Sequence, residues 1–167
     1  AAYGALADGL QDRTFVILGT SHYGPSEKFG LTRKPFETPF GTAAAAVDLA
    51  AELAAAAPDG AVMEDYHHSI EHSVEFQVLL LQHLFGPQVR ILPVLCGAFA
   101  RSIYEGGMPE DDPGVAAFLS ALGRLASREG DRLFWVLGID MAHQGRRYGD
   151  REPATAGRGG MVDTGES

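Results

Sequence analysis

Thr14-Phe15-Val16-Ile17-Leu18, a continuous apolar run ended by Gly19, is the stretch of sequence that decides the fold. Residues 89–95 and 133–137 form two further runs of this kind, and a glycine follows each within two residues. Such runs are typical of strands that are covered on both faces of a sheet. Pro93 is an exception inside the second run, because proline lacks a backbone donor and prefers an edge or a bulge. The sequence therefore predicts three core strands.

Helical patterns separate these predicted strands. An Ala-rich helix is predicted over residues 43–57 with Thr42 as its cap, a second helix over 71–85 and a third over 113–130. Strands that alternate with helices indicate an α/β fold with a mostly parallel or mixed central sheet flanked by helices. We expect a single domain over residues 1–167, irregular over 151–167 and incomplete at both ends, because the chain opens without Met in mid-pattern.

Composition restricts the class of function. The 167 residues include 13 Lys and Arg against 22 Asp and Glu, which gives a formal net charge of −9. This acid excess argues against a nucleic-acid partner, because such binding needs clustered Lys and Arg. No apolar run reaches the roughly 18 residues of a membrane span, and residues 1–20 lack the pattern of a signal peptide. Cys96 is the single cysteine, which fits a reducing compartment. We expect a cytoplasmic protein without a membrane partner.

Polar side chains follow the predicted core strands. His22 comes soon after the first strand, Cys96 ends the second, and Asp140 and His143 follow the third. In parallel α/β sheets, ligands bind at the carboxyl ends of the strands. The sequence therefore predicts a cleft at these strand ends that accepts a small-molecule or peptide ligand. Cys96 is interpreted as a buried filler, because no cationic neighbour in the sequence would lower its pKa.

The segment from His68 to His72 carries the sharpest local pattern. Its H-x-x-E-H spacing matches zinc hydrolases in which a Glu, here Glu71, activates a metal-bound water. That hypothesis requires one helix that presents both histidines on the same face. The alternative is an ordinary helix N-terminus in which Ser69 is the cap and the acidic residues lie near the positive end of the helix dipole.

Five motifs in order give the chain a resemblance to a known family. They are Val16-Ile17-Leu18-Gly19-Thr20-Ser21-His22, Thr38-Pro39-Phe40-Gly41-Thr42, the segment from His68 to Gln77, Ile91 to Gly97, and Asp140 to Asp150. Together they cover about residues 3 to 150 and resemble the Memo family, whose bacterial members are called AmmeMemoRadiSam system protein B. The resemblance implies a fold shared with the class III extradiol ring-cleaving dioxygenases, in which a non-haem iron lies at the strand ends.

The resemblance also implies roles for individual residues. His22 matches a metal ligand of the family and His72 a pocket histidine, while Ala142 stands where the family has a cysteine ligand. We expect His22, His72 and Asp140 to be the metal ligands here, and the metal to be iron or copper. His72, Glu71 and His143 are the expected catalytic residues, with His72 moving a proton or binding substrate and Glu71 as its partner. The implied activity is that of a metal-dependent oxidoreductase. The alternatives are a metal-free module that binds a peptide in the same cleft and, third, the zinc hydrolase.

Overall fold

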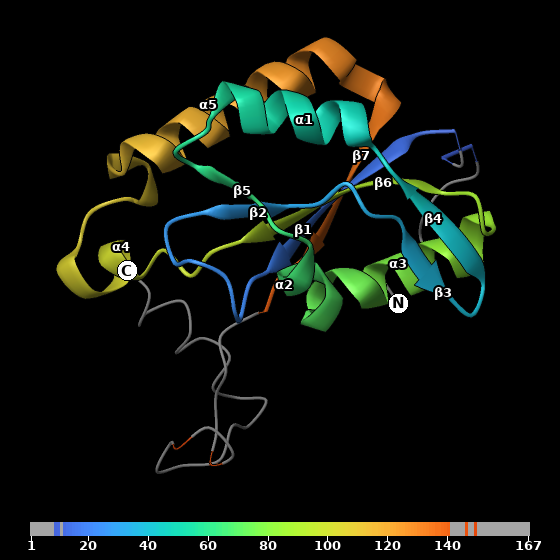
Figure 1. The fold of residues 1–167 in the computed structure, drawn as a ribbon, viewed down its shortest axis with the longest axis horizontal. Coiled ribbons are helices and arrows are strands. Elements are labelled where there is room, and N and C mark those ends of the chain that lie inside the picture. Colours follow the sequence, from blue (N-terminus) through green and yellow to red (C-terminus); the bar gives the residue numbers. More distant parts are fainter. Residues whose placement is uncertain (1–8, 11, 141–145, 147–148, 150–167) are drawn as a thin grey trace, which may run out of the picture.

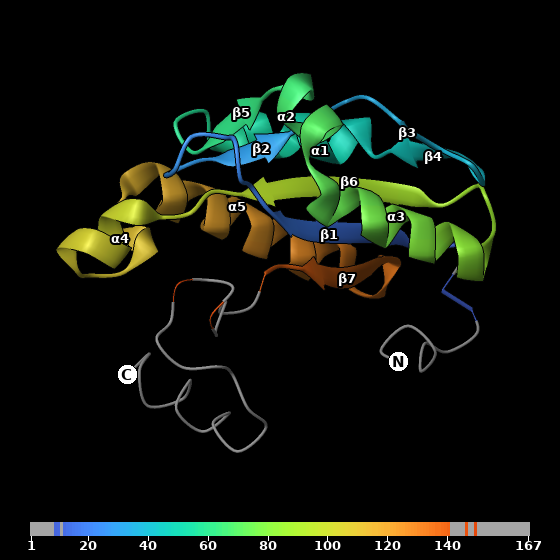
Figure 2. The same ribbon diagram turned by 90° about the horizontal axis from the view of Figure 1, so that it is seen from below.

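Three parallel strands form the centre of the molecule, as the sequence predicts. The computed structural model describes residues 9–10, 12–140, 146 and 149. Strand β1 (Thr14–Thr20) lies between β6 (Arg90–Cys96) and β7 (Leu133–Gly138), and both pairings are parallel. Helices α1 (Val47–Ala56) and α5 (Pro113–Glu129) cover one face of the sheet, and α2 (Asp65–Ile70) and α3 (His72–Phe85) lie on the other (Figures 1 and 2). The α/β fold with helices on both faces is therefore confirmed.

Short strands complete a seven-stranded sheet with the main order β3-β4-β6-β1-β7. β4 pairs parallel with the start of β6, and β2 pairs antiparallel with the end of β6. β3 pairs antiparallel with β4, and β5 pairs parallel with β2, so the sheet is mixed but mostly parallel. The short strands are β2 (Phe29–Leu31), β3 (Phe36–Thr38), β4 (Gly41–Ala45) and β5 (Ala61–Met63); α4 (Ala100–Glu105) and two 3₁₀ turns, Pro109–Asp111 and Gly130–Arg132, complete the described elements.

Pro93 is tolerated inside a core strand because two short strands, β4 and β2, pair with the same side of β6 and leave a gap between them. The Ala46 amide donates to the carbonyl of Ile91, so residue 93, two positions on, presents its backbone to the same flank. β4 ends its pairing at Ile91, and β2 begins its pairing only at Val94. The missing N–H of Pro93 therefore falls in the gap between two partners, where it costs no ladder hydrogen bond.

The helix predicted over residues 43–57 is wrong in its first part. Residues 41–45 form β4, α1 begins only at Val47, and Thr42 caps nothing, since the N-cap is Ala46 without a side-chain hydrogen bond. Alanine favours helix locally, but pairing with β3 and β6 outweighs a propensity difference of well under about 1 kcal/mol per residue. The other two predicted helices are confirmed as α3 and α5.

Two apolar cores stabilise the sheet, one on each face. Val16 and Leu92 face α1 and α5, while Phe15 and Ile17 face α3. β1 is buried on both faces, as its continuous apolar run predicts. β7 is not, because Leu137 is 64% exposed there. Within the described ranges, no helix has the length and apolar character needed to cross a membrane.

Candidate metal site

Three chain segments meet at the carboxyl end of β1. His22 follows β1, Glu71 and His72 begin α3, and Asp140 follows β7. Thr20 joins the three segments, because its Oγ1 accepts the Asp140 amide at 2.9 Å and its carbonyl accepts Ser73 Oγ at 2.9 Å. The parallel pairing of β1 with β7 thus brings together residues 118 positions apart.

Glu71 separates α2 from α3 and organises the site. Its extended backbone (φ −96°, ψ 128°) ends the first helix, and its carboxylate caps the second by accepting the amides of His72 at 3.0 Å and Ser73 at 3.3 Å. The same carboxylate accepts the His22 amide at 2.9 Å. Glu71 is only 2% exposed. Burial opposes ionisation, but the hydrogen bonds from His22 and Ser73 hold the pKa of Glu71 below its usual value.

His22 lies between two carboxylates. Its Nδ1 is 3.0 Å from both Glu71 oxygens, and its Nε2 is 2.9 Å from Asp140 Oδ2. Because a carboxylate accepts hydrogen bonds, this arrangement favours a proton on both ring nitrogens of His22. The hydrogen bond to Glu71 is the main cause that raises the pKa of His22, against partial burial that lowers it.

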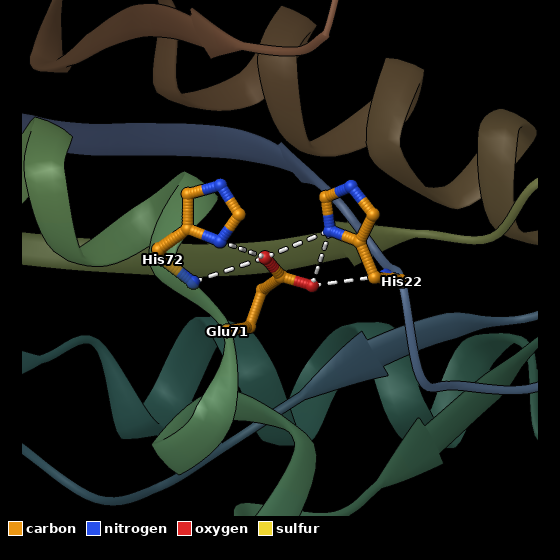
Figure 3. Close-up of side chains that lie close together, drawn as sticks. All are labelled: His22, Glu71 and His72. Carbon is orange, nitrogen blue, oxygen red and sulfur yellow. Dashed lines mark hydrogen bonds and ion pairs between the residues drawn. The ribbon is translucent and has the colours of Figure 1, made fainter. Parts of the chain in front are cut away.

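The His72 ring lies beside the His22 ring and contacts the same Glu71 carboxylate. The two rings are stacked with centroids 5.4 Å apart and planes 16° apart, and His72 Nδ1 lies 3.3 Å from Glu71 Oε1. In Figure 3 the second nitrogen of each ring points away from Glu71 toward the same side. The His72 side chain is 56% exposed and that of His22 is 37% exposed, so solvent reaches both rings.

This geometry offers a cation two positions. His22, Glu71 and His72 supply ligand atoms that all lie within 4.8 Å of one another, which defines one position on the Glu71 side. The other position lies on the far side of the rings, where Asp140 Oδ2 is 2.9 Å from His22 Nε2. Two ligands at right angles around a metal with bonds of about 2.1 Å lie about 3 Å apart, so this spacing suits a shared ion. Among the described residues, His22, Glu71 and His72 therefore fit a metal, and Asp140 adjoins this set through His22.

His68 does not join this cluster. It belongs to α2, and the extended backbone of Glu71 separates α2 from α3, so His68 and His72 do not share one helix face. His68 is 6% exposed, makes an edge-on contact with Phe36, and neither ring nitrogen has a hydrogen-bond partner of ordinary geometry. Burial lowers its pKa to about 4, despite the opposing effect of the Gly30 backbone. The arrangement that the zinc-hydrolase alternative requires is thus absent from the described residues.

Two other sequence expectations have different outcomes. Cys96 at the end of β6 is partly buried, and burial raises the pKa of its thiol to about 11, as expected for a filler rather than a nucleophile. His143 lies outside the described residues. A pocket of about 280 Å³ lies apart from the cluster, and its wall includes His68, Phe36 and Lys34 but none of the four clustered residues.

Sequence reasoning missed the residues that position the site. In the sequence Thr20 and Ser73 are only members of motifs, whereas in the structure their hydrogen bonds tie the ends of β1, β7 and α3 together. Gly19 belongs with them, because a Cβ there would lie 2.6 Å from Ser73 Oγ. Their signal in the sequence is position alone, since each lies within three residues of His22 or His72.

The fold and the cluster define a class: an α/β protein with histidines and carboxylates gathered where the central parallel strands end. Comparison with known proteins identifies the family, because the family model described as "Memo-like protein" matches residues 1–161. The chain therefore belongs to the Memo family.

Similar proteins carry the same family name. A MEMO1 family protein of Methanococcoides burtonii is 29% identical over 130 residues, which is 78% of this chain and 44% of the relative. One of Thermococcus kodakarensis is 33% identical over 147 residues, 85% of this chain and 46% of the relative. One of Aquifex aeolicus is 25% identical over 150 residues, 90% of this chain and 36% of the relative. The chain thus spans less than half the length of these relatives.

Proposed function

We propose that this Memo-family chain binds a redox-active metal ion through His22, His72 and Asp140, with Glu71 orienting the histidines. The observation that carries the proposal is the buried Glu71 carboxylate, which touches Nδ1 of both rings. Metal-bound histidines commonly donate their second ring N–H to a carboxylate, which fixes the tautomer and raises ligand basicity. With Nδ1–H held by Glu71, each ring offers the lone pair of Nε2 for coordination.

The remaining ligand in this proposal is Asp140. Its Oδ2 lies 2.9 Å from His22 Nε2, and the Thr20 hydroxyl holds its backbone amide. A cation there would replace the proton on His22 Nε2, so metal and proton compete for one atom. The charge balance supports binding, because the site combines two carboxylates with two imidazoles that are neutral once metallated.

The donor set supports iron ahead of copper. Two histidines and one carboxylate on one side of an ion are the ligand set of non-haem Fe(II) oxygenases, and they leave coordination positions open. An iron ion held in this way would supply one-electron chemistry with dioxygen. His72 is 56% exposed and is positioned to hold a ligand or a proton at the open side of the site. A small-molecule or peptide ligand and an oxidoreductase activity belong to this proposal.

Elemental analysis tests the proposal. The full chain, purified without a metal-affinity step, is expected to carry about one iron or copper ion, and His22→Ala is expected to lose nearly all of it, because one ligand is removed. His83→Ala is the matched control, since His83 is an exposed histidine of α3 outside the cluster. Metal-free protein, or equal metal content in His22→Ala and His83→Ala, would refute a metal site at His22. The metal-free interaction module would then be the remaining hypothesis.

A further inference from the structure

His68 is a buried histidine that lacks a hydrogen-bond partner and forms part of a pocket wall. Only 6% of the residue is exposed, and neither ring nitrogen has a partner of ordinary geometry. Buried polar groups in folded proteins are nearly always paired, so an unpaired one points to a ligand, an ion or a water. His68 lines a pocket of about 280 Å³ between the connection from β2 to β3 and the helices α2 and α3. A partner for His68 can enter through this pocket.

The charged side chains of the pocket are mostly carboxylates. Glu37, Asp65 and Glu75 line it, and Lys34 is the one cationic side chain that the described residues contribute to the wall. Three carboxylates against one lysine give the wall a formal charge of −2. Asp65 accepts a hydrogen bond from Thr32 Oγ1 at 2.6 Å, which holds this carboxylate in place. The wall therefore attracts a ligand that carries positive charge.

His68 can take part in binding such a ligand. Burial lowers its pKa to about 4, so the ring is neutral at pH 7 and one nitrogen offers a lone pair to an ammonium group. Solvent does not reach either nitrogen, so the ring must turn to meet a ligand. A half turn about the Cβ–Cγ bond, a torsion with two-fold character in histidine, exchanges each nitrogen with a ring carbon. The turn keeps the shape of the ring and breaks no hydrogen bond of ordinary geometry.

The pocket suits a small organic cation better than a metal ion. Among the described residues, only His22, Glu71 and His72 form a group of three ligating side chains within 4.8 Å, so the pocket does not surround a single ion with ligands. Phe36, whose ring contacts that of His68 edge-on, gives the wall an apolar part that suits methylene groups. Sites for drug-sized ligands usually measure about 300–1,000 Å³, so this pocket takes a ligand of few atoms.

We propose that this pocket binds a small aliphatic diamine, with one ammonium group held between Asp65 and the turned ring of His68. The two positive charges of a diamine balance the formal charge of the wall, and its methylene chain packs against Phe36. The site shares no residue with the candidate metal site, so the proposal holds whether or not His22 and His72 bind a metal.

Calorimetric titration of the full chain with 1,5-diaminopentane at pH 7 tests the proposal. We expect one molecule to bind per chain with a Kd of about 1 mM or below, and no binding of 1,5-pentanediol, which has the same length without charge. Asp65→Asn should weaken binding at least about fivefold, because it removes a charge that faces the ligand. Asp131→Asn is the matched control at an exposed aspartate outside the pocket and should leave the affinity unchanged. Equal affinities of the two variants would indicate general attraction to an acidic chain and overturn the proposal.

NMR of the histidine side chains locates the bound diamine. Addition of 1,5-diaminopentane at constant pH should shift the ring nitrogens of His68 and leave those of His83, on α3 outside the pocket, unchanged. His68→Leu should lose most of the binding and stay folded, because leucine leaves no buried nitrogen unpaired. If His68→Leu fails to fold, the NMR shifts of the unchanged chain decide. Unshifted His68 nitrogens, undiminished binding by folded His68→Leu, or equal binding of the diol would overturn the proposal.

Discussion

Replacing Glu71 by Gln tests the organising role of the buried carboxylate. One carboxylate oxygen accepts the His22 amide, and the other accepts the amides of His72 and Ser73. A glutamine keeps the size but offers one acceptor oxygen and one NH₂ donor, so its NH₂ must face a backbone N–H on one side. The substitution thus leaves at least one buried donor without a partner.

The expected loss follows from those contacts. An unpaired buried donor costs about 1–3 kcal/mol, and losing the negative charge at the N-terminus of α3 costs about 0.3–1 kcal/mol more. The free energy of unfolding should fall by about 1.3–4 kcal/mol, which corresponds to about 3–16 °C in Tm for a domain of this size. Thermal unfolding at pH 7 in the presence of EDTA measures the effect without any contribution from metal.

Glu75→Gln is the matched control, because Glu75 is an exposed carboxylate in the first turn of the same helix. It should lose at most about 1 kcal/mol, the usual size of a helix-dipole contribution. If Glu71→Gln proves no more destabilising than Glu75→Gln, the buried carboxylate does not organise the site, and the reasoning about His22 and His72 fails with it.

Three further predictions concern pH, positioning and packing. Folding lowers the pKa of His68 from 6.5 to about 4, so as the pH drops the unfolded chain takes up this proton before the folded chain does. The free energy of unfolding should therefore fall by about 3 kcal/mol between pH 6.5 and pH 4. Urea unfolding of His68→Leu should lack this loss, whereas His83→Leu should keep it; equal pH profiles would contradict the assignment. Thr20→Val removes the hydroxyl that accepts the Asp140 amide, so it should weaken iron binding about tenfold in a competition titration with little change in Tm. An unchanged affinity for iron would show that Thr20 does not position Asp140. Gly97→Ala should lower the free energy of unfolding by at least about 3 kcal/mol, because the new Cβ would lie 2.1 Å from the Ser26 carbonyl oxygen. Gly123→Ala is the control, since it has open space in α5 and should raise the free energy of unfolding by up to about 1 kcal/mol. Equal unfolding midpoints for the two variants would contradict the close backbone contact at Gly97.

The sequence predicts the centre of the fold because burial dictates composition there. β1 is buried on both faces and therefore reads as an unbroken apolar run. The short strand β4 is not predictable in this way, because its residues Gly41–Ala45 include helix-favouring alanines. Pairing with β3 and with β6, nearly 50 positions away, makes them a strand. Local propensity holds no information about that partner.

The proximity of the candidate residues follows from the sequence more readily than their geometry does. Strand-end position and motif resemblance point to His22, Glu71, His72, Asp140 and His143; the structure brings the first four together, and His143 lies outside the described residues. The helical break at Glu71 was not predictable, because the H-x-x-E-H pattern suits one continuous helix equally well. The separation of His68 from His72 depends on the extended backbone of one residue, which the tertiary hydrogen bonds of Glu71 stabilise.

The position of the metal is the most direct test of the account. An anomalous-scattering map from crystals of the iron-loaded full chain should show one peak bonded at about 2.1 Å to Nε2 of His22 and a carboxylate oxygen of Asp140 and, once the His72 ring tilts toward it, to Nε2 of His72. Glu71 should remain within hydrogen-bond distance of both Nδ1 atoms. A peak on the Glu71 side, bonded to Nδ1 atoms and that carboxylate, or no peak at the cluster, would contradict the account.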